Sequence, residues 1–360
     1  MSKKPFQTLH QMVKLAKRNL HQTSWDYLIG GTETETTVAR NRMSLDSLAF
    51  KPRVLHDVSS VDTRSTFLNQ PLTMPVLLAP VGSLQAFDPG GGATATKAAA
   101  EAGIMSIASS VCTPGVEEIA AASDAAKVYQ LYVRGNADWV DDIILRVVDS
   151  GYKAFCLTVD TSVVSRRERD IAKGVIPTSP TTPGDMGYQA SLNWKDVERI
   201  KQKFDIPLIL KGINTAEDAV KAVEHGVDVV YVSNHGGRQL DHGRGAIDLL
   251  PEIVEALNGR AEIAFDGGVC RGSDVVKAMA LGANAVGIGR LEAWALAAGG
   301  LEGLVHCLKI LKTEIRGTLA LLGVANFDEL NSSFVTAAAP VTIPSVMSAF
   351  PLLNLEDPGY

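Results

Sequence analysis

Short apolar runs alternate along this chain with longer segments that place apolar residues at helical spacing, from residue 74 onward. The runs are too short for helices and are bounded by Gly, Pro or polar residues, which is typical of buried strands. We predict strands at 74–82, 104–109, 127–133, 154–159, 207–211, 228–233, 261–266 and 284–289. Helices are predicted at 91–103, 114–122, 137–150, 193–204, 215–225, 246–258, 272–281 and 293–313.

Eight strand–helix units predict an α/β fold whose parallel sheet is covered by helices. Such units close naturally into a (β/α)8 TIM barrel, here over about residues 74–315. The alternative is an open, doubly wound sheet. The segment after the first strand, "APVGSLQAFDPGGG", lacks the Gly-x-Gly-x-x-Gly turn typical of nucleotide-binding sheets of that kind. The pattern therefore favours the barrel.

Three segments lie outside this alternation. Residues 1–70 predict an N-terminal helical extension, because "TLHQMVKLAKRNL" places apolar residues at helical spacing. Residues 161–192 interrupt the fourth unit with a stretch rich in Pro, Gly and Thr, and a break of this length is typical of a lid or a disordered loop. The tail, 331–360, is expected to lie on the surface or on a neighbouring subunit. We interpret 1–360 as one domain.

Composition narrows the class of protein. The chain has 360 residues, 46% hydrophobic and 21% charged, which is an ordinary globular balance. A net charge of −6 argues against nucleic-acid binding. The N-terminal segment lacks the apolar core of a signal peptide, and no apolar run approaches the roughly 20 residues of a membrane helix. Four widely separated cysteines predict neither a metal site nor a disulfide framework. We expect a soluble, cytoplasmic protein.

Polar residues end nearly every predicted strand, and in a TIM barrel the active site lies at those carboxyl ends. Each residue alone also has a structural explanation, such as satisfying a backbone group or beginning a turn. A lysine placed directly after "PLIL" is hard to explain in a purely structural barrel. The candidates are Pro80–Gly82, Ser109, Gln130, Tyr132, Thr158, Asp160, Lys211, Ser233–Arg238, Asp266 and Gly289–Arg290.

Two of these ends indicate a phosphate site. "FDGGVCRGSD" (265–274) follows the seventh strand with a glycine pair ahead of a helix, and "GIGR" (287–290) ends the eighth strand before another helix. Glycines let backbone N–H groups approach an anion, and helix N-termini favour negative charge. The loops after strands seven and eight are the usual phosphate site of this barrel. The alternative is that Gly267, Gly268 and Gly289 serve tight turns only.

The segment "VVYVSNHGGRQLD" (229–241) carries the strongest candidates for catalysis. His235 has a side chain suited to take a proton near neutral pH. Arg238 has the planar fork that binds a carboxylate through two hydrogen bonds. Asp160 is placed to orient His235, and Lys211 to supply a fixed positive charge beside an electron-accepting ring. The alternative for His235 is an ordinary loop histidine.

These motifs resemble the FMN-dependent α-hydroxy acid oxidase/dehydrogenase family, which includes glycolate oxidase, lactate oxidase, lactate monooxygenase and mandelate dehydrogenase. "SNHGGRQLD" is similar to the family's signature, and the resemblance spans roughly residues 8–325. The other matching segments follow in the family's order: "WDYLIGG", "APVG", "YQLYV", "LTVD", "RRERD", "LILKGI", "DGGV", "RGSD" and "GIGR".

The resemblance implies a role for each candidate. His235 would be the base, with Asp160 supporting it and Lys211 stabilising the reduced cofactor; whether the proton leaves the α-carbon or the hydroxyl stays open. Arg238 and Arg167 would hold the substrate carboxylate, and Tyr132 would bond the substrate oxygen. FMN would be bound by Pro80, Val81, Gly82, Ser109, Gln130, Thr158, Lys211, Ser233, Asp266, Gly267, Gly268, Gly289 and Arg290.

Four features depart from the family pattern. Trp25 in "WDYLIGG" stands where the family usually has a tyrosine that helps bind the substrate, so we expect Trp25 in the substrate site. Gly82 replaces a frequent alanine beside the flavin, which bears on oxygen reactivity. Cys270 stands where an arginine typically faces the FMN phosphate, leaving Arg290 and Arg271 to supply that charge. The 161–192 segment is also shorter than in relatives.

We therefore expect an enzyme that oxidises an (S)-2-hydroxy acid, lactate- or glycolate-like or larger, to the 2-oxo acid. Oxygen or another acceptor would reoxidise the FMN. The alternatives are a monooxygenase like lactate monooxygenase, a dehydrogenase linked to a quinone or carrier protein, and a flavin-binding protein without hydroxy-acid turnover. The resemblance also implies a homotetramer.

Overall fold

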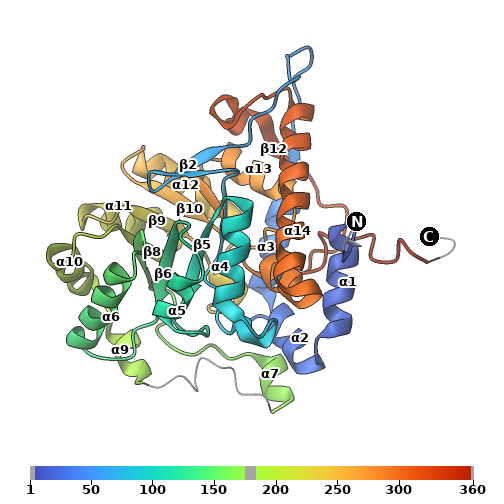
Figure 1. Ribbon diagram of the computed structural model, residues 1–360. Helices are drawn as coiled ribbons and strands as arrows, with labels where there is room; N and C mark the ends of the chain where they lie inside the picture. Colours follow the sequence, from blue (N-terminus) through green and yellow to red (C-terminus); the bar gives the residue numbers. More distant parts are fainter. Residues whose placement is uncertain (1–4, 175–183, 358–360) are drawn as a thin grey trace.

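The computed structural model describes residues 5–174 and 184–357. Eight parallel strands close into a barrel in the order β10-β11-β4-β5-β6-β7-β8-β9, and helices surround them (Figure 1). This closure confirms the predicted TIM barrel and excludes the open sheet. The strands are β4 (Val76–Leu78), β5 (Met105–Ser109), β6 (Lys127–Leu131), β7 (Ala154–Thr158), β8 (Leu208–Ile213), β9 (Val229–Val232), β10 (Glu262–Phe265) and β11 (Ala285–Ile288).

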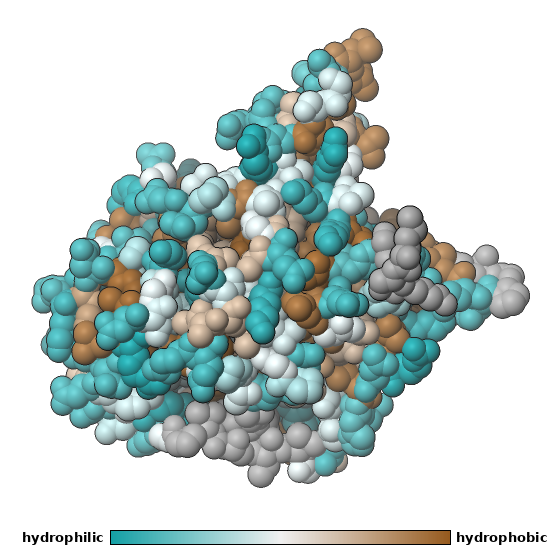
Figure 2. Space-filling view, viewed as in Figure 1, coloured by the Kyte–Doolittle hydropathy of each residue, from teal (hydrophilic) through white to brown (hydrophobic). Residues whose placement is uncertain are grey.

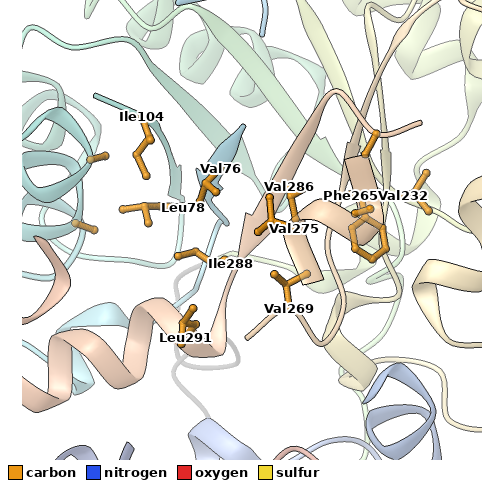
Figure 3. Close-up of a cluster of buried hydrophobic side chains, with 14 of the residues drawn as sticks. Val76, Leu78, Ile104, Val232, Phe265, Val269, Val275, Val286, Ile288 and Leu291 are labelled. Carbon is orange, nitrogen blue, oxygen red and sulfur yellow. The ribbon is translucent and has the colours of Figure 1, made fainter. Parts of the chain in front are cut away.

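Helices cover the outside of the barrel close to the predicted positions. Polar caps begin several of them: Asn136, Asn193 and Thr215 each accept a backbone N–H at a helix start. Figure 3 shows part of the apolar layer between strands and helices, with the side chains of Ile288 and Leu291. The helices are α4 (Gly91–Ala102), α5 (Val116–Ala121), α6 (Ala137–Asp149), α10 (Trp194–Lys203), α11 (Ala216–Glu224), α12 (Ala246–Leu257), α13 (Gly272–Ala280) and α14 (Arg290–Leu322).

Helix α14 is longer than the predicted 293–313 and bends where Gly299 and Gly300 leave helical geometry. By length and composition alone it could cross a membrane. However, 61% of its most apolar window is buried inside the protein, and it packs against α4, α13 and the N-terminal helix. It is thus largely a core helix of this fold.

The N-terminal extension is helical, as predicted, and it reaches the carboxyl ends of the strands. It contains α1 (Leu9–Asn19), α2 (Gln22–Ile29) and α3 (Thr36–Asp46). Helix α1 begins with a capping box between Thr8 and Gln11 and packs against α14. Helix α3 contacts the 3-10 turn η2 (His235–Gly237) and α12. The extension therefore forms part of the wall around the strand ends.

The two ends of the barrel are covered by different segments. A hairpin of β2 (Ser65–Phe67) and β3 (Gln70–Leu72) lies at one end, and its Phe67 and Leu72 pack with the barrel interior. Of the interruption predicted at 161–192, residues 175–183 lie outside the described residues. The rest includes α7 (Glu168–Ala172) and α9 (Met186–Ser191), and α7 lies at the opposite end from β2 (Figure 1).

Part of the C-terminal tail packs on this same chain. After two 3-10 turns, η3 (Phe327–Glu329) and η4 (Ser332–Phe334), strand β12 (Val335–Ala337) pairs antiparallel with β1 (Leu48–Phe50). Further on, Phe350 is 1% exposed and packs edge-on against Trp294 and His10. This places Val346 in the wall of the cavity described below.

Candidate active site

A cavity opens at the carboxyl ends of the barrel strands, where the sequence predicts the site. Beyond the predicted residues, its wall includes Tyr27, Val38, Asn41 and Arg42 from the N-terminal extension, and Phe87, Val111, Gln239 and Cys270. The predicted residues that line it are Pro80, Val81, Gly82, Tyr132, Arg167, Lys211, His235, Arg238, Asp266, Gly267, Gly268, Gly289 and Arg290.

A left-handed turn after β9 presents His235 to this cavity. Three consecutive residues have positive φ: 58° at His235, 63° at Gly236 and 74° at Gly237. Glycine is required at 237, since a Cβ there would lie 2.6 Å from the backbone nitrogen of Val38. The Asn234 side chain accepts a hydrogen bond from the Gly237 N–H at 3.2 Å. The extension and the turn thus fit directly against each other.

His235 is held between two side chains from neighbouring strand ends. Its Nδ1 lies 3.0 Å from Asp160 Oδ1, just beyond β7, and its Nε2 lies 3.2 Å from the Tyr132 hydroxyl, just beyond β6. Burial lowers the pKa of His235, outweighing the opposite effect of Asp160. Burial alone would raise the pKa of Asp160, but His235 and Lys211 lower it on balance. At neutral pH this gives a neutral imidazole beside a carboxylate.

Two arginines and a tyrosine form a second group. Arg238 Nη1 donates to the carbonyls of Tyr27 (2.6 Å) and Gly30 (3.1 Å). Its buried Nη2 has no hydrogen-bond partner among the described residues. The guanidinium lies 4.6 Å from the centre of the Tyr27 ring, and that of Arg167 lies 5.8 Å from it. Burial, and then Arg167, lower the pKa of Arg238 to about 9. An anion here would find an unpaired donor and two cations.

The prediction that Trp25 lies in the substrate site is wrong. Its side chain is 5% exposed, belongs to the hydrophobic core and does not line the cavity. Residues two positions apart on a helix point in different directions, and it is Tyr27 that faces the cavity. Burial alone would raise the pKa of the Tyr27 phenol, but Arg238 and Arg167 lower it on balance. The tyrosine expected at this place is therefore present as Tyr27.

A polar network crosses the remaining strand ends. Lys211 Nζ donates to Ser233 Oγ at 2.9 Å, and Ser233 Oγ donates to Asp266 Oδ1 at 2.5 Å. Burial lowers the pKa of Lys211, but Asp266 and Asp160 raise it on balance, so the lysine stays cationic. Beside it, Ser109 donates to Gln130 (2.8 Å), whose amide donates to Thr158 (2.9 Å). Ser109, Gln130, Thr158 and Ser233 are buried and are not part of the cavity wall itself.

At the predicted phosphate end, the arginines that supply positive charge differ from those expected. Arg290 donates to the carbonyls of Leu28, Gly30 and Gly236, at 3.1, 2.7 and 2.8 Å, so its guanidinium joins α2 to the turn at His235. Cys270 is buried in the cavity wall, and burial raises the pKa of its thiol to about 12. Arg42 also lines the cavity and donates to the Gly268 carbonyl at 2.6 Å. The sequence pattern did not single out Arg42.

Gly82 has a local structural explanation. A Cβ at this position would lie 2.7 Å from Val111 Cγ2, closer than such contacts occur. An alanine at 82 therefore requires Val111 to move. The two residues together shape one wall of the cavity.

A comparison with protein families decides the classification. Residues 16–337 match the model of the FMN-dependent dehydrogenase family. The chain belongs to this family. It is 37% identical to an L-lactate oxidase from a Nostoc species over 354 residues, which is 91% of this chain and 97% of that protein. It is also 37% identical to glycolate oxidase from Spinacia oleracea over 345 residues, 90% of this chain and 94% of that protein.

Solved structures give the same result. A crystal structure of mandelate oxidase superimposes with a TM-score of 0.87 at 33% identity, and the match covers 94% of this chain and all of that one. A second, with (S)-2-phenylpropionate bound, gives a TM-score of 0.85 at 33% identity over the same shares of the two chains. Family membership confirms FMN as the expected cofactor.

The cavity residues fit this cofactor. The buried cation Lys211 lies at one strand end, suited to a ring that becomes negatively charged on reduction. Glycines after β10 and β11 keep the backbone close to the cavity beside the N-terminus of α14, as a phosphate requires. Among residues 5–174 and 184–357, no group of three His, Cys, Asp or Glu side chains is arranged to hold a metal ion.

Proposed function

We propose that this protein is an FMN-dependent oxidase of (S)-2-hydroxy acids that produces the 2-oxo acid. The observation that carries the proposal is the pairing of His235, whose imidazole is oriented by buried Asp160, with Arg238, whose buried Nη2 has no hydrogen-bond partner in the described part of the chain. A base beside a carboxylate clamp suits chemistry at the carbon next to that carboxylate. The relatives named lactate, glycolate and mandelate oxidase support this substrate class.

Each residue has one task in this proposal. Arg238 and Arg167 hold the substrate carboxylate, which fixes the 2-hydroxyl near His235 and Tyr132. His235 Nε2 takes the proton that leaves the substrate, and Asp160 stabilises the resulting imidazolium. Tyr132 bonds the substrate oxygen. FMN, when bound, accepts the two electrons. Lys211, a buried cation, would stabilise the negative charge of the reduced cofactor.

The apolar part of the cavity supports a substrate with an apolar side chain. Phe87 and Val111 line the cavity, and Phe87 stacks on Tyr27 at a centroid distance of 6.2 Å. The carboxylate clamp therefore lies beside apolar surface. We propose that lactate and larger 2-hydroxy acids are used in preference to glycolate, which has no side chain to bury.

Turnover in air tests the reaction and its acceptor. Holoprotein is supplied with glycolate, (S)-lactate and (S)-mandelate, and 2-oxo acid and hydrogen peroxide are measured with and without catalase. The proposal expects one peroxide per 2-oxo acid. Loss of carbon dioxide without free peroxide would indicate the monooxygenase, and turnover only with an added quinone would indicate the dehydrogenase.

The pH dependence of flavin reduction follows from the pKa of His235. The base works in its neutral form, so the rate rises with pH through the pKa of His235, which lies below its ordinary value of 6.5. We expect a rate that is level around neutral pH and falls in acid. In Asp160→Asn the rate falls and the acidic limb moves to lower pH, because Asp160 raises the pKa of His235. Stopped-flow measurement of flavin reduction across the pH range gives both effects. An acidic limb that moves to higher pH in Asp160→Asn would contradict the pairing of Asp160 with His235.

Tyr27 and Trp25 give a matched pair of variants. Tyr27→Phe removes a hydroxyl beside the arginine clamp and is expected to weaken substrate binding about tenfold, as loss of one hydrogen bond to a charged group does. Trp25→Phe is expected to lower the melting temperature and leave substrate affinity unchanged. Substrate-dependent flavin reduction and thermal unfolding measure the two effects. A weaker affinity in Trp25→Phe alone would reverse our assignment.

The proposal also covers the cellular compartment and the oligomeric state of the protein. We propose a cytoplasmic homo-oligomer. The chain after β1 projects from the body and ends in an apolar tip (Figure 2), where Val54 and Leu55 are 79% and 102% exposed. We propose that these adjacent side chains pack against another subunit, because exposed apolar surface gathered in one place marks contact sites. Light scattering of the purified protein measures the assembly, and a monomer would contradict this part.

A further inference from the structure

We propose that Gln189 is a positioning residue that holds the two partners of His235 at their working separation. This inference rests on the proposed function of His235. Gln189 lies on α9, is 2% exposed and does not line the cavity. Its Oε1 accepts the Val133 N–H at 2.6 Å, and its Nε2 donates to the Thr158 carbonyl at 2.8 Å.

The two backbone groups belong to neighbouring strand ends that no longer pair with each other. The ladder between β6 and β7 runs from Val128 with Ala154 to Leu131 with Leu157. Past that rung, Val133 needs an acceptor and Thr158 needs a donor, because buried backbone groups are rarely left unpaired. The Gln189 amide supplies both and replaces the missing rungs of the ladder.

These strand ends carry the residues that hold His235. Val133 directly follows Tyr132, whose hydroxyl lies 3.2 Å from His235 Nε2. Thr158 is two residues before Asp160, whose Oδ1 lies 3.0 Å from His235 Nδ1. The Gln189 bridge therefore fixes the spacing of Tyr132 and Asp160 from outside the cavity.

The segment that leads into α9 is itself fixed against the chain just after β6. The Asp185 N–H donates to the Arg134 carbonyl at 3.1 Å, and the Asp185 side chain accepts the Gly187 N–H at 2.8 Å. Gly184, at φ 117°, lies so close that a Cβ there would be 2.4 Å from Arg134 Cβ. A side chain with one donor and one acceptor is needed at 189: an ionised carboxylate only accepts, and a lysine only donates.

Gln189→Leu tests the bridge, because leucine is similar in size and has no polar group. The titratable and charged groups around His235 are Asp160, Tyr132, Lys211 and Arg167. Of these, Gln189 is joined to the strand ends that carry Asp160 and Tyr132, whereas Lys211 and Arg167 lie on other segments, as does the carboxylate-binding Arg238. We expect flavin reduction about 10- to 100-fold slower, as displacement of a reacting group by an ångström causes, with unchanged substrate affinity.

A second readout does not depend on turnover. The His235 imidazole is titrated by NMR in the holoprotein labelled at histidine Cε1, with His235→Ala for assignment. Because Asp160 raises the pKa of His235, the titration midpoint is expected to fall in Gln189→Leu. Gln189→Glu keeps the acceptor for the Val133 N–H but, when ionised, has no donor for the Thr158 carbonyl, so its flavin reduction should also be slower than in the wild type. Tyr188→Ala, which removes the exposed neighbour on the same helix, should match the wild type.

The outcomes separate this inference from the proposed function. If Gln189→Leu and Gln189→Glu keep the wild-type titration and rate, even with a lower melting temperature, the amide is merely structural and the inference is overturned. If no hydroxy acid reduces the wild-type flavin, the proposed function fails, and the NMR titration still decides whether Gln189 positions the partners of His235.

Discussion

His235→Ala is expected to bind FMN normally and to lose reduction of the flavin by 2-hydroxy acids, by at least about 10²–10⁴-fold. The residue lies in the cavity wall, where its Nε2 faces Tyr132 and its Nδ1 is occupied by Asp160. Removing it leaves the substrate without a base and leaves the charge of Asp160 without its partner. Anaerobic stopped-flow absorbance measures the rate, and the visible spectrum reports the bound flavin.

The matched control is His56→Ala, which removes an exposed histidine on the projecting loop after β1. The flavin of this variant should be reduced by 2-hydroxy acids at the wild-type rate. If His235→Ala also kept a rate near that of the wild type, another group would have to be the base, and the proposal for this site would have to be rebuilt.

Arg238→Lys is expected to weaken substrate binding by roughly 10- to 100-fold, the cost of losing a hydrogen bond to a charged group. Arg238 donates from Nη1 to the carbonyls of Tyr27 and Gly30, while its Nη2 is unpaired within residues 5–174 and 184–357. A lysine has one nitrogen on a flexible chain and cannot serve the backbone and the carboxylate with the geometry of a planar fork. The apparent dissociation constant from anaerobic reduction at varied substrate concentration measures the loss.

Arg244→Lys is the control for this substitution, because Arg244 is an exposed arginine paired with Glu252. Its substrate affinity should match the wild type. An Arg238→Lys variant with unchanged affinity would mean that the carboxylate binds elsewhere, for example on Arg167 alone.

The barrel could be predicted from sequence because its strands are buried on both sides. Continuous apolar runs such as "VVYV" mark them clearly, and the structure places nearly every strand inside the predicted range. Helix α3 is different. Its buried face includes Thr37, Asn41 and Arg42, which contact polar backbone near the site, so an apolar pattern does not reveal it.

The position of a residue relative to the strands explains which site residues sequence reasoning found and which it missed. Lys211 lies in the second half of β8, and Asp160 and His235 follow β7 and β9 within three residues, where the fold itself predicts the active site. Tyr27 comes from a helix of the extension, and its distinction from Trp25 depends on which way the helix faces. Gln189 is far from the strand ends in sequence and reaches them only through the packing of α9.

The most direct test of the central claim is anaerobic mixing of the FMN-loaded protein with glycolate and with the (S)- and (R)-enantiomers of lactate and of mandelate. We predict that the oxidised flavin absorbance bleaches with the (S)-acids, fastest with those that carry an apolar side chain, and that the matching 2-oxo acid forms in equal amount. A flavin that stays oxidised with every acid would contradict the account.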